Sequence, residues 1–131
     1  MRLQDRVAVV TGGGSGIGRA IAEALARDGA PVAVVDLLPP GGMQTVEAIT
    51  GAGGRAAFVQ ADVSQWAEVD GLFGKVTAQL GPVGIVVNAA GILDGYAPAH
   101  EMSPALWSKV IAINLTGTFF ACKRADRKSV V

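Results

Sequence analysis

The sequence predicts an α/β fold in which helices cover both faces of a doubly wound parallel sheet. Two observations carry this prediction. Short segments in which every residue is apolar alternate along the chain with longer segments whose apolar residues recur at helical spacing. Strands that are apolar on both faces are typical of parallel sheets buried between helices. Right-handed crossovers between successive strands then produce the doubly wound arrangement.

The first half of the chain predicts strand, helix, strand and helix. Residues 6–10 form an uninterrupted apolar strand, and residues 17–27 carry alanine, isoleucine and leucine at helical spacing. A glycine ends that helix, and residues 32–36 form the second strand, which closes on an aspartate. Two glycines open the second helix, residues 43–50, and the run GAGG ends it.

The second half repeats this alternation. Residues 55–60 form the third strand, and Ser64 is expected to cap a helix over residues 65–80 that ends at a Gly-Pro pair. Residues 83–87 form the fourth strand. After a loop, the Ser-Pro pair at 103–104 starts the last helix, because serine caps a helix and proline suits its first turn. The predicted sheet is therefore truncated after its fourth strand and the helix that follows.

Composition limits the class of protein. The length of 131 residues fits one domain, and 50% hydrophobic against 17% charged residues argues against disorder. Eleven basic residues balance eleven acidic ones, so neither nucleic acid nor a membrane is expected as a partner. The apolar runs are shorter than a bilayer span, and no cluster has metal-ligand spacing. A single cysteine and the lack of a signal-peptide core favour a cytoplasmic location.

The stretch Thr11 to Gly18, TGGGSGIG, lies between the first strand and the first helix. This placement presents backbone N–H groups and a helix N-terminus to a phosphate. Glycine is needed to turn sharply, to let the backbone approach a pyrophosphate and to let the helix pack on the strand. The sequence therefore predicts a Rossmann-type dinucleotide site at this turn.

Asp36 ends the second strand, twenty residues past Gly16. A carboxylate there accepts hydrogen bonds from ribose hydroxyls and repels a 2′-phosphate, which favours NAD over NADP. Neither Leu37 nor Ser15 offers a positive charge to a 2′-phosphate. The alternative interpretation is an ordinary loop aspartate, and the spacing from the glycine turn favours the ribose role.

Two further turns follow the third and fourth strands. Asp62 and Val63 could meet the adenine ring through a carboxylate and a backbone N–H, or Asp62 could cap the next helix. The run NAAG, residues 88–91, lies where the strand order is expected to reverse and where ligands bind in such sheets. Its small residues leave room for a cofactor, and Asn88 could join neighbouring strands. The alternative for this run is a simple tight turn.

Asn114 lies inside an otherwise apolar helix, LWSKVIAINLTGTFF. A buried amide needs hydrogen-bond partners, so it either braces the helix against a strand or serves a proton relay. His100 is expected to be a solvated side chain. The large aromatic residues are expected to pack in the core or between helices, and they are Trp66, Trp107, Phe119 and Phe120.

In this order, the motifs resemble the short-chain dehydrogenase/reductase family, close to the 3-oxoacyl-carrier-protein reductase-like group, over residues 5–125. The resemblance implies NAD as cofactor and hydride transfer between an alcohol and a ketone. It implies that Asn114 is catalytic, through a water in the proton relay, and that the full-length protein forms a homo-oligomer. The residues it places at the cofactor are Gly12, Gly14, Ser15, Gly16, Ile17, Gly18, Asp36, Asp62, Val63, Asn88, Ala89 and Gly91.

The family's catalytic serine, tyrosine and lysine have no counterpart here. Tyr96 is the only tyrosine, lies in a loop between Gly95 and Pro98, and is followed four residues later by His100 rather than lysine. We therefore expect residues 1–125 to be an NAD-binding half-domain that is inactive alone.

Three other functions are alternatives to this one. The first is a non-catalytic nucleotide-binding remnant, which would bind NAD without turnover. The second is an S-adenosylmethionine methyltransferase, against which the NAAG turn and the spacing of the glycine turn argue. The third is a P-loop nucleotidase, which fails because Arg19 and Ala20 replace the required Lys-Ser/Thr pair.

The last six residues, DRKSVV, do not continue the amphipathic pattern of the final helix. DRKSVV followed by a stop is the translation of GATCGGAAGAGCGTCGTGTAG, which resembles a common sequencing adapter. We hypothesise that residues 126–131 are a non-native tail. We also expect the fourth strand to be an open apolar edge and the chain to be poorly soluble.

Overall fold

The computed structural model describes residues 2–126, and within this range it contains one four-stranded parallel sheet. The strands lie in the order β3-β2-β1-β4. Their bounds are β1 (Val7–Thr11), β2 (Val32–Asp36), β3 (Ala56–Gln60) and β4 (Val83–Asn88). The predicted strands are confirmed to within one residue at each end, and the doubly wound α/β fold is confirmed with them.

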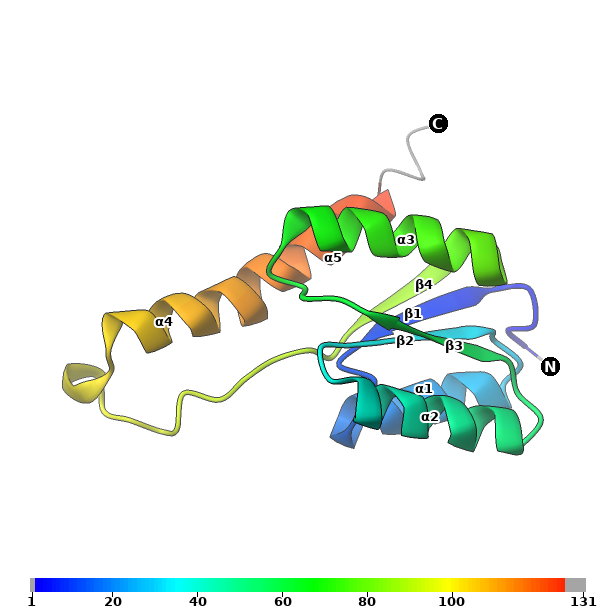
Figure 1. Cartoon of the computed structure of the whole chain (residues 1–131), viewed down its shortest axis with the longest axis horizontal. Helices are drawn as coiled ribbons and strands as arrows, with labels where there is room; N and C mark the ends of the chain where they lie inside the picture. Colours follow the sequence, from blue (N-terminus) through cyan, green and yellow to red (C-terminus); the bar gives the residue numbers. More distant parts are fainter. Residues whose placement is uncertain (1, 127–131) are drawn as a thin grey trace.

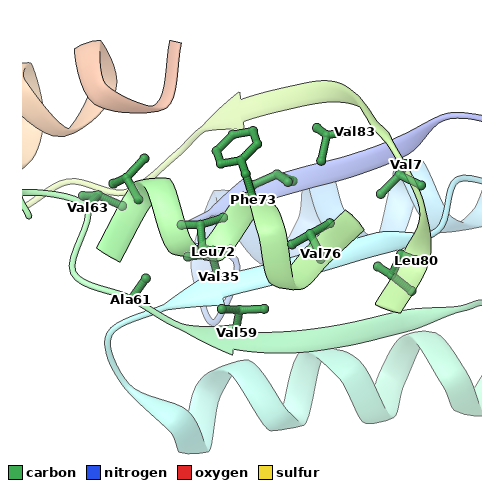
Figure 2. Close-up of a cluster of buried hydrophobic side chains, with 13 residues drawn as sticks. Val7, Val35, Val59, Ala61, Val63, Leu72, Phe73, Val76, Leu80 and Val83 are labelled. Carbon is green, nitrogen blue, oxygen red and sulfur yellow. The ribbon is translucent and has the colours of Figure 1, made fainter. Parts of the chain in front are cut away.

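Helices cover both faces of the sheet, as Figure 1 shows. Helices α1 (Gly16–Arg27) and α2 (Pro39–Gly51) lie on one face, and α3 (Trp66–Leu80) and α5 (Gly117–Asp126) lie on the other. Each face has its own apolar core. The core beneath α3 unites side chains from all four strands with the inward face of that helix, including Val59, Leu72, Phe73, Val76 and Val83 (Figure 2).

The strand order reverses at β1. The chain moves from β1 outward to β2 and β3, and it then returns to place β4 on the other side of β1. Thr11, the last residue of β1, is in register with Val35 of β2 and with Asn88 of β4. The carboxyl ends of these three strands therefore meet at the point where doubly wound sheets bind ligands.

A long helix follows β4 after a loop and the short turn η1 (Ala99–Glu101). It comprises α4 (Pro104–Val110), a π-helical segment η2 (Ile111–Thr116) and α5. Ser103 Oγ accepts a hydrogen bond of 3.1 Å from the backbone N–H of Leu106, which confirms the predicted cap. In Figure 1, α4 projects beyond the edge of the sheet, whereas α5 lies beside α3.

This long helix, Pro104–Asp126, is the one helix among the described residues that is long and apolar enough to cross a membrane by length and composition alone. Uninterrupted apolar runs alone do not predict this helix as a candidate span. Core helices of soluble proteins meet the same criterion, so the match is weak evidence for a membrane span.

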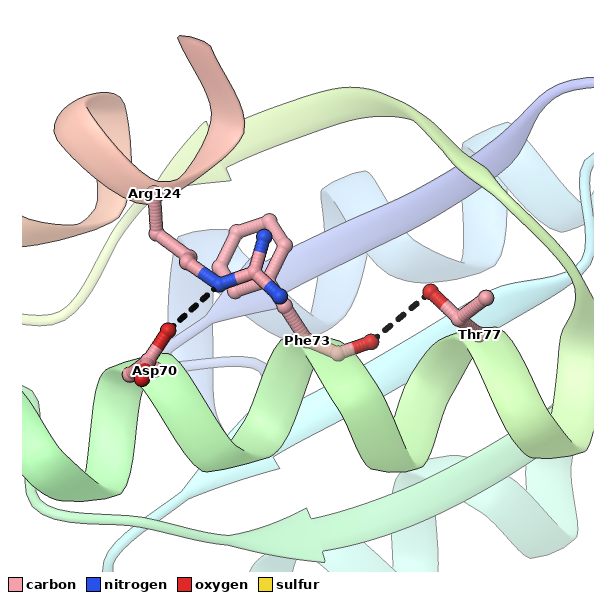
Figure 3. Close-up of polar contacts among 4 residues, drawn as sticks. All are labelled: Asp70, Phe73, Thr77 and Arg124. Atoms are coloured by element: carbon pink, nitrogen blue, oxygen red, sulfur yellow. Dashed lines mark hydrogen bonds and ion pairs between the residues drawn. The ribbon is translucent and has the colours of Figure 1, made fainter. Parts of the chain in front are cut away.

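Helix α5 is attached to α3 by polar and aromatic contacts. Arg124 Nε lies 2.8 Å from Asp70 Oδ1, and its guanidinium lies 5.3 Å from the centre of the Phe73 ring (Figure 3). The rings of Trp66 and Phe120 meet edge to face, with 5.5 Å between their centres. The packing role predicted for these two aromatic residues is confirmed.

Three expectations about local structure were wrong. Helix α2 begins at Pro39 rather than Met43, because proline suits the first turn and the two glycines lie inside the helix. Ser64 does not cap α3, whose N-cap is Gln65 without a side-chain hydrogen bond. Trp107 and Phe119 are exposed, not core, since α4 projects away from the sheet in Figure 1 and the ring contact of Phe119 is with Phe120 of its own helix.

Candidate functional site

The glycine turn leads from the buried end of β1 directly into α1. Gly12 has φ +65° and Gly16 has φ +53°, a backbone region that L side chains rarely adopt. Ser15 is extended and precedes the first residue of α1. Ile17, at the start of this helix, is an apolar residue that is 78% exposed. The turn therefore presents the helix N-terminus and Ile17 at the surface beside the strand ends.

Gly12 and Gly18 are required by close contacts. A Cβ on Gly18 would lie only 2.1 Å from the Gly12 carbonyl oxygen, so only glycine lets α1 approach β1. A Cβ on Gly12 would lie 2.7 Å from the backbone nitrogen of Ala90, so the turns after β1 and β4 are in direct contact. Thr11 Oγ1 joins them as well, since it accepts a hydrogen bond of 3.3 Å from that nitrogen.

The backbone of the turn is accessible at Gly16. A Cβ on Gly16 would meet nothing within 4 Å, in contrast to the tight contacts at Gly12, Gly14 and Gly18. Open space beside the N-terminus of α1 fits a pyrophosphate, which needs close approach to backbone N–H groups. The residues present thus fit the phosphates of a dinucleotide. Gly12 makes the sharp turn, Gly16 leaves the backbone open to a phosphate, and Gly18 lets the helix pack on the strand.

Asp36 ends β2 with its carboxylate beside the glycine turn. Its Oδ2 accepts a hydrogen bond of 2.9 Å from the Gly14 backbone N–H, and its Oδ1 accepts one of 3.0 Å from the Leu38 N–H. Leu37 and Leu38 are 53% and 67% exposed. Asp36 is therefore a fixed negative charge at the strand ends, between the glycine turn and an exposed apolar surface.

Asp62 is engaged in local hydrogen bonds. Its Oδ1 accepts hydrogen bonds from the Ser64 backbone N–H (2.9 Å) and the Ser64 hydroxyl (2.6 Å). It therefore stabilises a turn before α3 and does not cap the helix itself. Val63 is buried, and a Cβ on Gly117 would lie 2.7 Å from its Cγ2, so its side chain packs against α5. The adenine contact of these two residues stays a prediction.

The run after β4 lies beside the glycine turn, as the sequence predicts. Asn88 does not join two strands through its side chain, because its Nδ2 lies 3.6 Å from Cys122 Sγ on α5. Ala89 lies against Gly12, and a Cβ on Gly91 would lie 3.3 Å from Asn114 Oδ1. The small residues of this run therefore allow β1 and the long helix to approach from opposite sides.

Asn114 is exposed, so the premise that its amide is buried was wrong. Its Oδ1 accepts a hydrogen bond of 2.9 Å from the Ile92 N–H, and its Nδ2 donates one of 2.9 Å to the Ile92 carbonyl oxygen. The residue lies in η2, where the helix widens, and its own carbonyl accepts a hydrogen bond from Thr118 Oγ1 (3.0 Å). The side chain thus braces the long helix against the segment that follows β4.

Neither Tyr96 nor His100 joins the site. Tyr96 has φ +58°, is 83% exposed and lies in a turn closed by its N–H to Asp94 Oδ1. His100 is exposed and lies 3.6 Å from Glu101 Oε1. Among residues 2–126, no group of three or more His, Cys, Asp and Glu side chains could hold a metal ion.

Sequence analysis missed two residues of this region, Arg19 and Thr45. Arg19 contacts the glycine turn from α1, and Thr45 contacts it from α2. The available signal was position 45, because a polar residue between Gly42 and Ile49 falls on the inward face of α2 and must be hydrogen-bonded there. The pairing of Thr45 with Arg19 could not be predicted from the sequence, since Arg19 lies 26 residues away on α1.

A family model described as short chain dehydrogenase matches residues 6–128. Among solved structures, the citronellol catabolism dehydrogenase of Pseudomonas aeruginosa PAO1 superposes with a TM-score of 0.89 at 29% identity. That superposition covers 97% of this chain and 52% of the other. The rest of the Pseudomonas protein has no counterpart in the present sequence.

Curated relatives show the same proportion. D-threitol dehydrogenase of Mycolicibacterium smegmatis is 40% identical over 127 residues, which cover 97% of this chain and 48% of that protein. Cis-4-hydroxycyclohexanecarboxylate dehydrogenase of Sinomonas cyclohexanicum is 42% identical over 123 residues, which cover 94% and 49%. The chain thus spans about half the length of these two curated relatives.

Proposed function

The chain belongs to the short-chain dehydrogenase family, and we propose that it is the cofactor-binding part of an NAD-dependent oxidoreductase that interconverts an alcohol and a ketone. The observation that carries the choice of cofactor is the position of Asp36. Its carboxylate is held at the end of β2, beside the glycine turn, by two backbone N–H groups. A negative charge at that place accepts ribose hydroxyls and repels a 2′-phosphate.

The roles of the remaining residues follow from their places. The backbone at Gly16 and the N-terminus of α1 hold the pyrophosphate, and exposed Leu37 and Ile17 offer apolar surface to the rest of the nucleotide. When bound, the nicotinamide ring supplies or accepts the hydride. Asn114 keeps the long helix in place against Ile92, and it holds a water of the proton relay in the complete enzyme.

We further propose that a longer protein contains this chain. The chain spans about half of its relatives, and residues 2–126 contain only the exposed Tyr96 as a candidate tyrosine acid. The complete protein would act on a small-molecule alcohol or ketone in the cytoplasm and would self-associate. The non-native tail belongs to the same proposal. Asp126 ends α5, and residues 127–131 lie outside the described part of the chain.

Long-read sequencing of the locus across codon 125 tests this proposal. We expect the reading frame to continue into a strand with a serine and then a Tyr-x-x-x-Lys helix. A clean genomic read that encodes DRKSVV followed by a stop would contradict it. In that case only a nucleotide-binding remnant remains, which binds NAD without turning over an alcohol.

Isothermal titration calorimetry tests the choice of cofactor. We expect the chain to bind NAD at least ~10-fold more tightly than NADP, because the Asp36 carboxylate repels the 2′-phosphate. In Asp36→Asn, the removal of that charge should bring the dissociation constants for NAD and NADP closer together. Asp5→Asn is the matched control, since Asp5 precedes β1 at the opposite end of the sheet. Equal or tighter NADP binding by the unmodified chain would reject the proposal.

A further inference from the structure

Arg19 connects the glycine turn to α2. It lies one residue after the last glycine of the turn, and its guanidinium is directed at α2 rather than at the strand ends. Nη2 donates to the carbonyl oxygens of Gly14 (2.6 Å) and Gly41 (3.2 Å) and to Gln44 Oε1 (3.2 Å). Nε donates to Thr45 Oγ1 at 2.9 Å. One side chain of α1 thus binds the turn and α2 together.

Thr45 completes this connection from α2. Its side chain is fully buried, and its hydroxyl donates to the Gly13 carbonyl oxygen at 2.8 Å while accepting from Arg19 Nε. A buried hydroxyl without a partner would be costly, so these bonds fix its orientation. Thr45 and Arg19 therefore hold two consecutive carbonyl groups of the turn, those of Gly13 and Gly14.

The orientation of these carbonyls determines the direction of the neighbouring N–H groups. In a planar trans peptide, the C=O and the N–H point in opposite directions, and the described residues contain no cis peptide bond. Because the Gly13 carbonyl faces Thr45, the Gly14 N–H faces away from it and donates to Asp36 Oδ2 at 2.9 Å. Because the Gly14 carbonyl faces Arg19, the Ser15 N–H is directed away from the guanidinium.

The turn and α2 are in contact without space for a side chain. A Cβ on Gly41 would lie 2.6 Å from the Gly14 carbonyl oxygen, and one on Gly14 would lie 2.9 Å from the Gly42 nitrogen. Apolar side chains therefore cannot hold these segments together at this point. Their relative position depends on the hydrogen bonds from Arg19 and Thr45.

We propose that Arg19 and Thr45 are positioning residues that set the discrimination between NAD and NADP through Asp36. This rests on the proposed function. With both residues in place, the Gly14 N–H holds the carboxylate where it accepts ribose hydroxyls and repels a 2′-phosphate. Without them, the Gly13–Gly14 peptide rotates more freely and the carboxylate turns away. NAD then loses a preorganised acceptor, and NADP loses a repulsive charge.

The experiment measures Kd for NAD and for NADP by calorimetry in the whole chain and in two variants, Arg19→Met and Thr45→Val. We expect each variant to bring the two constants ~10-fold closer to one another. The matched controls are Arg27→Met, an exposed arginine of α1, and Thr50→Val, whose hydroxyl bonds only within α2. Both controls should keep the ratio of the unmodified chain.

Two further variants separate positioning from a general loss of structure. Thr45→Ser keeps the hydroxyl and should restore the discrimination that Thr45→Val loses. The double variant Arg19→Met with Thr45→Val should change the free-energy difference between NAD and NADP binding by less than the sum of the two single changes. The reason is that both residues orient the same two neighbouring peptide groups. Arg19 is only partly buried, so Arg19→Met keeps the test usable if Thr45→Val does not fold.

Three results would overturn the inference. An unchanged Kd ratio in Arg19→Met and Thr45→Val, with both affinities lowered equally, would show a merely structural role. A selective loss of NADP binding in Arg19→Met would make Arg19 a phosphate ligand instead. If the unmodified chain does not prefer NAD, the proposed function itself fails and the inference fails with it. The Kd ratio of the unmodified chain therefore distinguishes a failure of the proposed function from a failure of this inference alone.

Discussion

The backbone N–H of Gly14 donates a hydrogen bond of 2.9 Å to Oδ2 of Asp36, and this bond joins the turn after β1 to the end of β2. The contact is close enough that a Cβ on Gly14 would lie 2.7 Å from the same oxygen. Glycine at this position therefore serves the placement of the carboxylate as well as the path of the backbone. Under the proposed function, phosphate contact and ribose recognition would therefore depend on the same short segment.

Gly14→Ala should disturb both the fold and the site. The added methyl group meets Asp36 Oδ2 and, at 2.9 Å, the Gly42 nitrogen, so backbone must shift. We expect the free energy of unfolding to fall by about 1–3 kcal/mol and NAD affinity to fall with it. Urea titration and calorimetry measure the two effects.

Gly71→Ala is the matched control for this substitution. Gly71 lies in α3 with open space around its Cβ position, and alanine favours a helix interior. We expect the free energy of unfolding to rise by about 0.5–1 kcal/mol and the NAD affinity to stay unchanged. Equal stability of the two alanine variants would contradict the contact at Gly14.

Asn114→Leu should loosen the segment after β4. It removes both 2.9 Å hydrogen bonds to the Ile92 backbone, and because Asn114 is exposed, water replaces part of what is lost. We expect a loss of about 1 kcal/mol in unfolding free energy and faster hydrogen exchange at the Ile92 amide. Asn114→Asp keeps the acceptor for that amide and should retain more protection. Unchanged exchange in Asn114→Leu would contradict bracing by this side chain.

The strands and the glycine turn were predictable because their causes are local. Apolar runs such as residues 32–35 must be buried on both faces. The glycines at 12 and 16 have backbone angles that other residues rarely adopt. The start of α2 was not predictable in this way. Glycine propensity argues against a helix at 41–42, but a side chain at Gly41 would meet the Gly14 carbonyl and one at Gly42 would meet the Phe58 ring.

The site was predictable in its position but not in its connections. The place of Asp36 follows from spacing along the chain, whereas its hydrogen bond to Gly14 and the bonds of Arg19 to α2 arise only when α1 and α2 pack together. The exposure of Asn114 also had no signal in the sequence. Its helix is apolar enough to indicate burial, yet most of that helix is uncovered in the described residues.

The pair formed by Arg124 and Asp70 should contribute modestly to the attachment of α5. The two side chains lie 2.8 Å apart but are 25% and 43% exposed, so solvent screens their attraction. A double-mutant cycle with Arg124→Met and Asp70→Asn should give a coupling of about 0.5–1 kcal/mol. The cycle isolates this pair from other interactions of either residue. A coupling that does not weaken in 1 M salt would contradict a screened ion pair.

Gly84→Lys should raise the solubility of the chain. Gly84 lies at the register shift of β4, one of the two edge strands within residues 2–126, and it is exposed. A Cβ there would meet only Arg6, at 3.8 Å or more, so lysine fits without a clash. A charge on an edge strand opposes pairing with a second sheet. Light scattering should show slower aggregation, whereas Gly71→Lys on α3 should leave the rate nearly unchanged. Equal rates in the two variants would mean that the open edge of β4 does not drive aggregation.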